Sequence, residues 1–240
     1  MKNLNVMDFI LPLFLIAVGA IIIIYVEINP TDSLVARMLS YSNMFKALRE
    51  HLLLMLVSMI GAIIVGVLGG ILLSRPKLYY LGRIVENIIN LGQTVPPLAI
   101  LALFFVIMGI GFRMAVFALF IYSILPILRN TFAGIIHVQP SVIESAKGMG
   151  MTPFRILTRI ELPLAFPITV AGIRTAVVIN VGTAAMATFI GGGGLGDLIV
   201  AGISLGRDMV IFTGASLAAL TAILLDYIIG QVEKGLVKWS

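Results

Sequence analysis

The sequence has no cysteine, two histidines, one tryptophan and charged side chains at only 11% of its 240 positions. Without cysteine the chain has neither disulfides nor thiolate metal ligands. His51 and His137 are isolated from each other and from other ligand-type residues, so we expect no metal site. No nucleophile is paired with a base and an orienting third group, so we expect a non-catalytic protein. Soluble domains carry about 25% charged residues, so the composition excludes that class as well.

Hydrophobic residues make up 60% of the chain, and they are gathered into long blocks. A helix needs about 20 apolar residues to cross the hydrocarbon core of a bilayer. The blocks of this length are residues 10–28, 51–73, 91–109, 114–136, 164–190 and 209–229. The first block has no small-residue cleavage site, so we interpret it as a retained span rather than a signal peptide. The sequence predicts an all-α polytopic membrane protein with about six transmembrane helices.

The basic residues predict the orientation of these spans. With six spans both termini lie on one side, and cytoplasmic segments carry the excess of Lys and Arg. If the termini are cytoplasmic, the inside segments hold Lys2, Arg75, Lys77, Arg83, Arg129, Lys147, Arg155, Arg159, Lys234 and Lys238, and the outside segments hold Arg37, Lys46, Arg49, Arg113 and Arg207. This imbalance predicts a multi-pass protein with both termini cytoplasmic. It also accounts for the net charge of +5 without a nucleic-acid partner.

Between the fourth and fifth spans lies a polar segment, residues 139–163, which we call the insert. Pro140 ends the preceding helix, because the residue before a proline disfavours the helical region. Ser141 and Glu144 have the spacing of a capping box, which predicts a helix start. Gly148 and Gly150 then end this helix, because glycine tolerates the left-handed conformation that follows a helix.

A second short helix is predicted in the insert. Thr152 is a suitable N-cap, Pro153 suits the first helical position, and Pro163 closes the helix. Arg155 and Arg159 share one face at a spacing of four residues. An interfacial connector that touches anionic lipid and a docking surface for a partner both fit this pattern. A DNA-binding helix-turn-helix does not fit, because spans hold both ends at the membrane.

The insert resembles the "EAA" loop of the permeases of ABC importers. The matching residues are Glu144, Ala146, Gly150, Ile160, Leu162 and Pro163, with Ser145 where the loop usually has alanine. Residues 92–99, 122–131, 144–151, 171–175 and 179–184 look like the osmoprotectant branch of this family. The resemblance covers about residues 47–232. It implies a type I ABC importer permease (MetI-like) fold, whose coupling helices sit in a groove of a cytoplasmic ATPase.

The same resemblance implies the function and the partners. The chain would be the permease subunit of an importer for compatible solutes, such as glycine betaine, choline, carnitine or related quaternary ammonium compounds. It would act with a cytoplasmic ABC ATPase that binds ATP and magnesium, an extracytoplasmic substrate-binding protein, and a second permease copy or paralogue. No cofactor is expected in this chain. The expected location is the cytoplasmic (inner) membrane of a bacterium or archaeon.

The resemblance also assigns regions and residues. Residues 1–46 would be an extra span with its outside loop, 47–232 the transmembrane core, and 233–240 a cytoplasmic tail. The residues expected to couple to the ATPase are Glu144, Ser145, Ala146, Lys147, Gly150, Met151, Arg155, Arg159, Leu162 and Pro163.

Polar residues within spans are costly, and this makes them functional candidates. Those that could line a translocation pathway are Asn87, Asn90, Gln93, Thr94, Tyr122, Asn180 and Thr183. The first four recur on one face of the third span, and hydrogen bonding between helices is the alternative role for the set. Pro96, Pro97 and Pro126 are expected to break their helices locally.

Two further features leave alternatives open. Gly191, Gly192, Gly193 and Gly194 lack the Gly-Lys-Ser/Thr ending of a phosphate-binding loop, so they form either a flexible outside turn or, by the resemblance, an external gate. Arg174 and Asp226 lie within spans. Extension of Arg174 to the interface is the simpler expectation, and pairing with Asp226 is the alternative.

Other functions also fit parts of the sequence. A permease of the same fold for an amino acid such as methionine is the nearest alternative. A stand-alone secondary transporter is more remote, because no two halves have matching hydropathy and Asp226 is the only carboxylate well inside a span.

Overall fold

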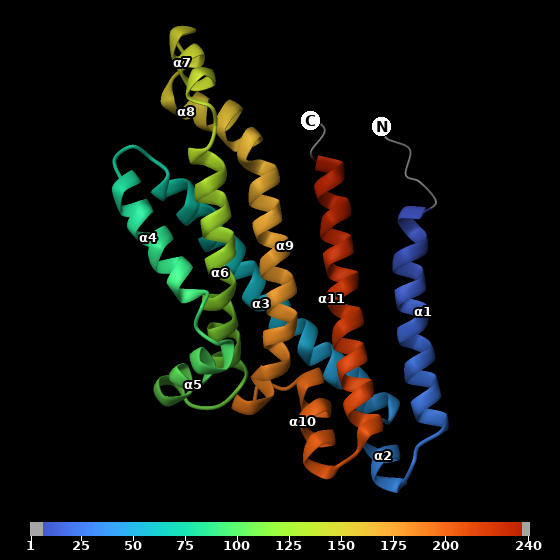
Figure 1. The fold of residues 1–240 in the computed structure, drawn as a ribbon. Coiled ribbons are helices and arrows are strands. Elements are labelled where there is room, and N and C mark those ends of the chain that lie inside the picture. Colours follow the sequence, from blue (N-terminus) through green and yellow to red (C-terminus); the bar gives the residue numbers. More distant parts are fainter. Residues whose placement is uncertain (1–6, 237–240) are drawn as a thin grey trace.

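The computed structural model describes residues 7–236, and within this range the chain is helical, with short turns and no strand. Long helices lie side by side, and shorter helices lie at both ends of the bundle (Figure 1). The helices are α1 (Met7–Ile28), α2 (Ser33–Met38), α3 (Tyr41–Leu73), α4 (Tyr79–Gly92), α5 (Pro97–Met108), α6 (Phe112–Ile136), α7 (Pro140–Gly148), α8 (Pro153–Ile156), α9 (Leu162–Met186), α10 (Leu195–Leu205) and α11 (Asp208–Leu236). Lys2 and Lys238, two of the predicted inside charges, lie outside the described residues.

Five helical stretches of the described range are long and apolar enough to cross a membrane, and α4 with α5 can form a sixth crossing. The predicted polytopic helical fold is confirmed. The bounds of the third span are wrong, because its helix begins at Tyr79 and the axis turns by 102° between α4 and α5. Pro96 and Pro97 explain the break, since proline donates no hydrogen bond and forces the preceding residue out of the helical region.

The fifth span is also longer than predicted. The π-helical segment η1 (Leu157–Glu161) joins α8 to α9, and the 3₁₀-helical segment η2 (Ala187–Ile190) extends the end of α9. Together they form one helical stretch of 38 residues, Pro153–Ile190. The expected break at Pro126 is absent as well, because α6 continues through this buried proline from Phe112 to Ile136. In membrane helices neighbouring groups can compensate for the backbone bond that a proline removes.

The bundle has two distinct ends. The start of α1, the end of α11 and the pair α7–α8 lie at one end, which we call the insert end (Figure 1). Helices α2, α5 and α10 lie at the other end, which we call the loop end. Counting α4 and α5 as one crossing, the chain passes six times between the two ends.

Helices α3, α6 and α9 form the centre, with the most extensive contacts between α3 and α6 and between α6 and α9. Glycine permits these close approaches. A Cβ atom on Gly70 would lie 2.6 Å from Thr131 Cβ, and one on Gly172 would lie 2.6 Å from Asn130 Cβ. Small residues at crossings are typical of membrane helices, which associate through tight packing rather than the hydrophobic effect.

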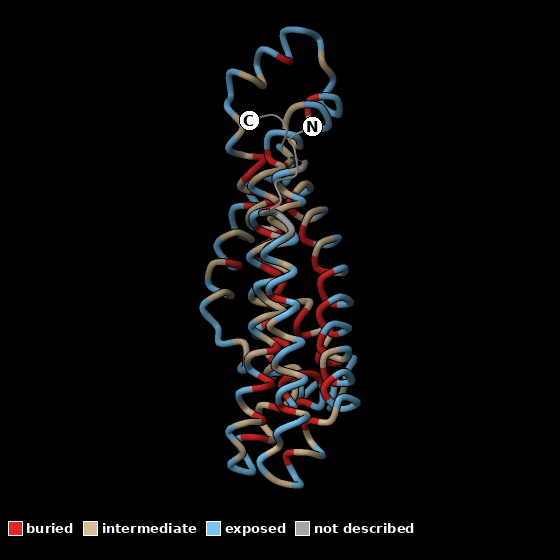
Figure 2. Tube along the Cα trace, turned by 90° about the vertical axis from the view of Figure 1, so that its right-hand side faces the viewer, coloured by how far each residue is buried: buried red, intermediate tan, exposed pale blue. Residues whose placement is uncertain are grey.

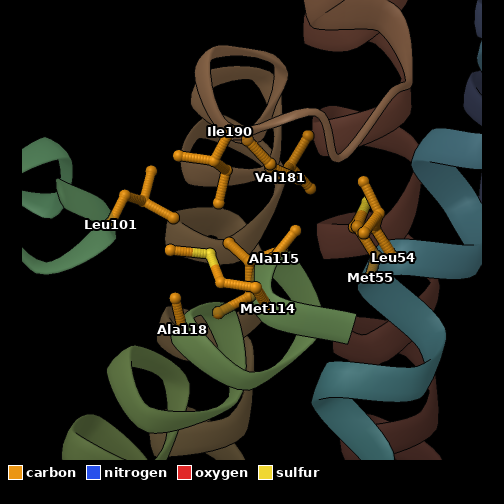
Figure 3. Packing of buried hydrophobic residues seen from close by; sticks show 11 residues of the cluster. Leu54, Met55, Leu101, Met114, Ala115, Ala118, Val181 and Ile190 are labelled. Carbon is orange, nitrogen blue, oxygen red and sulfur yellow. The ribbon is translucent and has the colours of Figure 1, made fainter. Parts of the chain in front are cut away.

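A buried apolar cluster joins several helices toward the loop end. Its members come from α3, α5, α6, α9 and η2, and Figure 3 shows their side chains meeting. They include Leu54, Met55, Leu101, Met114, Ala115, Ala118, Val181 and Ile190. Exposed positions run along the whole length of the helices (Figure 2), and many of them carry large apolar side chains, as expected for a bundle surrounded by lipid.

The extra N-terminal span packs mainly on α11. Beyond it, the Asp32 carboxylate caps α2 by accepting hydrogen bonds from the N–H groups of Leu34 and Val35, each at 2.9 Å. Asp32 Oδ2 also lies 3.0 Å from Arg207 Nε, just before α11 begins. The Val35 N–H and, to a smaller extent, Arg207 hold the pKa of the Asp32 carboxyl below its ordinary value, against the effect of burial. The loop end of α1 is thereby tied to the start of the last span.

An ion cluster joins α9 to α11 in the half of the bundle toward the insert end. Arg174 donates from Nε and Nη2 to the two carboxylate oxygens of Asp226, at 3.0 and 2.9 Å, and from Nη1 to Glu233 Oε2 at 3.2 Å. The pairing of Arg174 with Asp226, which the sequence left as the alternative, is therefore present. Pairing is favourable because the guanidinium donates two parallel hydrogen bonds to the carboxylate, and this lowers the free-energy cost of placing both charges within the spans.

We expect a double-mutant cycle to detect this pairing. Arg174→Met and Asp226→Leu should each lower the melting temperature of the purified protein, and the double variant should lose less than the sum. Both side chains are more than one-third exposed, so we expect a coupling energy of only about 1 kcal/mol. The Arg83–Glu86 pair, at 3.1 Å and three positions apart on one helix, is the control for a local ion pair and should give about 0.5 kcal/mol or less. Additive losses at Arg174 and Asp226 would contradict the assignment.

Candidate functional site

The insert forms a projection of two short helices beyond the end of the bundle (Figure 1). Helix α7 begins at Pro140, with Gln139 as a cap that makes no side-chain hydrogen bond. The predicted capping box of Ser141 and Glu144 is therefore wrong: Ser141 already lies inside the helix. Proline explains the earlier start, since its fixed φ suits the first helical turn and its missing N–H has no partner there to lose.

The turn of the insert follows the prediction. Gly150 has φ +77°, its N–H donates to Lys147 O at 2.9 Å, and the N–H of Met151 donates to Ala146 O at 3.1 Å. This pair of bonds is the Schellman ending, which satisfies helix-end carbonyls through a left-handed residue. Thr152 then caps α8 by accepting a hydrogen bond from the Arg155 N–H at 3.4 Å. These bonds order the turn by themselves.

The second helix of the insert does not end at Pro163. The π-helical turn Leu157–Glu161 carries it directly into α9, and Pro163 occupies the first turn of α9. There the missing N–H of proline is tolerated. The insert and the fifth span are therefore one continuous helical rod, whereas the sequence predicted a separate short helix that Pro163 closes.

Most of the predicted coupling residues lie on the surface of the insert. The exposed ones are Glu144, Ser145, Lys147, Gly150, Arg155, Arg159 and Pro163, with Met151 and Leu162 partly buried and Ala146 fully buried. Two residues that the sequence analysis missed are Met149 and Phe154, which flank the turn and are 74% and 72% exposed. Large apolar side chains held out on an otherwise polar turn are typical of a contact with another protein. Their position close to Gly150, at the turn of the insert, is the feature of the sequence that could have indicated their exposure.

The base of the insert is tied to the rest of the bundle. Arg75 Nη2 lies 2.7 Å from Glu161 Oε2 in an ion pair that connects the π-helical turn to the link between α3 and α4. The same guanidinium donates to Ser74 Oγ at 2.8 Å and to Ile71 O at 3.2 Å. The base of the insert is therefore attached to the end of α3 as well as to α9.

The polar residues of the third span lie around its break. Asn87 and Asn90 are in α4, whereas Gln93 and Thr94 lie in the turn that follows Gly92. The predicted single face is therefore correct for the two asparagines only. Asn87 is exposed in the single chain, Asn90 is partly buried, and the Thr94 hydroxyl donates to Leu91 O at 2.7 Å.

Asn180 lies in the centre of the bundle and is fully buried. Its amide nitrogen donates to Ser58 Oγ at 3.0 Å and to Ser123 Oγ at 2.7 Å, so it joins α9 to both α3 and α6. Thr183 donates to the Ile179 carbonyl of its own helix at 2.9 Å, and Tyr122 is partly buried on α6. Asn180 thus makes the hydrogen bonds between helices that were the alternative to pathway lining, and a role of the whole set in the pathway stays a prediction.

The glycine segment at the loop end is packed onto the bundle and is not a free turn. A Cβ atom on Gly192 would lie 2.9 Å from Ala115 Cβ, and one on Gly194 would lie 3.2 Å from the backbone and ring of His51. The Gly194 N–H also donates to Glu50 Oε2 at 3.3 Å. Positive φ at Gly191, Gly193 and Gly194 explains why glycines are required.

His51 stands out beneath this segment. It is fully buried, and neither ring nitrogen has a hydrogen-bond partner within the described part of the chain. A buried polar group without a partner costs free energy that a paired or hydrated group does not.

A hydrogen bond between the Thr188 hydroxyl and the Asp197 carboxylate connects η2 to the start of α10. Residues 188–197 therefore form an ordered segment at the loop end that contacts α3, and we call this segment the cover.

The family now follows from comparison. The profile of the family described as "Binding-protein-dependent transport system inner membrane component" matches residues 62–238. The chain belongs to this family, and it is therefore a multi-pass component of a transport system in the inner membrane.

Its relatives agree with the expected branch. The chain is 48% identical over 178 residues to the osmoprotectant import permease protein OsmY of Salmonella typhimurium, covering 74% of this chain and 75% of that one. It is 45% identical over 187 residues to the choline transport system permease protein OpuBB of Bacillus subtilis, covering 78% and 85%. The Bacillus subtilis glycine betaine/carnitine/choline transport system permease protein OpuCD is 43% identical over 188 residues, covering 78% and 81%.

The fold is similar to that of a solved transporter. A structure of the MetNI methionine ABC transporter in an inward-facing conformation superposes with a TM-score of 0.69 at 25% identity, covering 80% of this chain and 95% of that one. The expected MetI-like fold is confirmed. The resemblance to osmoprotectant permeases is confirmed by the relatives.

We expect the cover at the loop end to depend on glycine at position 194. Gly194→Ala forces an alanine to φ +98° and places its Cβ against His51, so the cover should lift. Because the chain has no cysteine, Ala115→Cys introduces a single reporter beneath Gly192. Labelling of this cysteine by a water-soluble maleimide should accelerate about threefold or more in Gly194→Ala.

Gly206→Ala is the matched control for this change. Gly206 also has a positive φ, of +62°, but a Cβ atom there meets nothing within 4 Å. Equal labelling rates in the two variants would show that contact with α3 does not hold the cover closed.

Proposed function

We propose that this chain is the permease subunit of an ATP-driven ABC importer for compatible solutes such as glycine betaine, choline or carnitine. Its helices would form the translocation pathway, and a separate cytoplasmic ATPase would bind ATP and magnesium and perform the hydrolysis. The observation that carries this proposal is the insert, a self-ordered turn that presents Met149 and Phe154 on a rod continuous with the fifth span. The names of the relatives support the substrate class.

The insert suits the transmission of force from the ATPase. Met149 and Phe154 would anchor in a groove of that subunit, with Arg155 and Arg159 contributing charge at the rim. Because α8 continues into α9, a tilt imposed on the insert would turn the fifth span as a rigid body. The Arg75–Glu161 pair would pass the same displacement to α3. Such rigid-body motions are a common way of switching between two states.

The opposite end suits delivery of the substrate. We infer that residues 188–197 form the external gate and that a substrate-binding protein docks over it. The charge count supports this orientation, with the insert and both termini cytoplasmic. In this view residues 1–46 are an extra span with its loop, 47–232 are the core, and 233–240 are a cytoplasmic tail.

A second permease, either a copy or a paralogue, would complete the pathway. The broken third span supports this, because α5 exposes Val106 and Ile107 at 81% and 71% in the single chain. Asn87 and Asn90 lie on α4, and Gln93 and Thr94 lie in the turn that joins α4 to α5. A partner against α5 would leave these polar groups close to the path between the two subunits.

We expect a change at Gly150 to uncouple transport from ATP hydrolysis. Valine is a poor fit to φ +77°, so Gly150→Val should distort the turn that carries Met149 and Phe154. Uptake and substrate-stimulated ATP hydrolysis by the assembled transporter should fall about tenfold or more, while insertion in the membrane stays normal. Gly148→Val is the control, because Gly148 has no positive φ and equally open surroundings. Unchanged uptake in Gly150→Val would refute the coupling role.

Competition experiments should identify the substrate class. Uptake of labelled glycine betaine into cells that express the whole transporter should be reduced by excess unlabelled betaine, choline or carnitine. Methionine should leave it unchanged, and inhibition by methionine would favour the amino-acid alternative. Depletion of ATP should abolish uptake, whereas uptake that persists without ATP would point to a secondary transporter.

A further inference from the structure

The extra N-terminal span leaves an apolar gap where it meets the core. Near the loop end α1, α3 and α11 converge on a common cluster that contains Val26, Met44 and Leu217. Farther along, the three helices enclose a cavity of about 430 Å³ lined by Ile16 and Ala20 of α1, Phe45 and Leu48 of α3, and Leu220 and Leu224 of α11. Its lining also includes Thr221, whose hydroxyl is already donated to Leu217 O at 2.7 Å. The cavity therefore suits a hydrocarbon chain and not a polar solute.

A second apolar groove, of about 320 Å³, adjoins the first. It runs along α3 and shares Phe45 and Leu48 with the first cavity, and it continues past Leu52 to Leu56. Phe45 and Leu56 are each 58% exposed in the single chain. The residues lining the groove recur at intervals of three and four, so they form one stripe on the outer face of the helix. The two apolar grooves thus adjoin along Phe45 and Leu48, which line both and which we call the ridge.

Arg49 lies at this pair of grooves. It lines the second groove, one residue after the ridge at Leu48, and it is exposed. Lys46 lies 3.9 Å from Glu50 and Arg207 lies 3.0 Å from Asp32, but Arg49 makes no ion pair within the described part of the chain. A guanidinium group binds a phosphate with two parallel hydrogen bonds. An unpaired arginine beside two apolar grooves matches a phosphodiester that carries two acyl chains.

We propose that one anionic diacyl phospholipid occupies this site, with its phosphate on Arg49, one chain in the cavity between α1, α3 and α11, and the other in the groove along α3. Tyr41, at the start of α3, also lines the cavity, and tyrosine is typical of the membrane interface where a headgroup lies. The lipid fills the gap between the extra span and the core, and so it holds α1 in place. This site is separate from the proposed transport function and does not depend on it.

The test measures phospholipid retained by the full-length protein. Wild type and variants are purified in mild detergent from a bacterial membrane, and phosphatidylglycerol and phosphatidylethanolamine per chain are measured by mass spectrometry. Arg49→Gln should reduce retained phosphatidylglycerol about fivefold, which is the effect of one basic residue on an anionic lipid. Arg37→Gln is the matched control, since Arg37 is exposed on α2 and lines neither groove. It should retain as much lipid as the wild type.

A second variant tests the groove without altering charge. Ala20→Phe fills the cavity between α1 and α11 from its own wall, so it should displace the lipid while Arg49 remains. Adding phosphatidylglycerol to the delipidated wild type should raise its melting temperature, and both variants should lose this response. Normal retention of phosphatidylglycerol in Arg49→Gln would overturn the headgroup assignment, and normal retention in Ala20→Phe would overturn the chain assignment. A dimer that forms through this face in place of bound lipid would also refute the proposal.

Discussion

The amide of Asn180 is the interaction on which the arrangement of this bundle depends. In a membrane the hydrophobic effect does not hold helices together, so tight packing and hydrogen bonds between helices must do so. Asn180 bonds α9 to Ser58 of α3 and to Ser123 of α6, and all three of these residues are buried. The same α9 continues into the insert at one end and into the glycine segment at the other. The central helix is thus joined to both of its neighbours at this level and extends beyond it in both directions.

The two ends of this rod are built on the same principle. Each is a turn that its own backbone bonds and close contacts hold in one shape, by the Schellman bonds around Gly150 and by the contacts of Gly192 and Gly194 with α6 and α3. Ordered turns transmit displacement, whereas flexible ones absorb it. The proposed coupling turn and the proposed gate therefore lie at opposite ends of one stiff element. The Arg174–Asp226 pair attaches α11 to that element as well.

Much of this fold was predictable because a membrane protein needs long apolar segments with basic residues on the cytoplasmic side. Block length and charge asymmetry gave the spans, and the glycines and Thr152 gave the turn of the insert, since each of these signals is local. The errors arose at prolines. Pro140 and Pro163 each start a helix, Pro126 lies inside one, and only Pro96 and Pro97 break a span. Which of these a proline does depends on the groups packed around it, and a single sequence does not contain that information.

The candidate functional residues were less predictable than the fold. The residues expected to couple to an ATPase follow a motif, so the sequence sufficed to name them as candidates. Met149 and Phe154 needed the structure, because their significance is that the turn leaves them exposed. The bonds of Asn180 and the pairing of Arg174 with Asp226 join residues that lie 52 to 122 positions apart, and such contacts leave no trace in local spacing.

The π-helical turn at Leu157–Glu161 has a consequence for how such proteins diverge. A π turn contains one residue more than an α-helical turn, and each residue turns an α-helix by about 100°. Loss or gain of one residue at this place would rotate the insert about the axis of α9 and leave the span below it unchanged. A lineage could thus re-aim the surface proposed to meet an ATPase in single steps, without rebuilding the part that lies in the membrane. The π-helical turn would then be the place where the orientation of the insert can change while the transmembrane core stays the same.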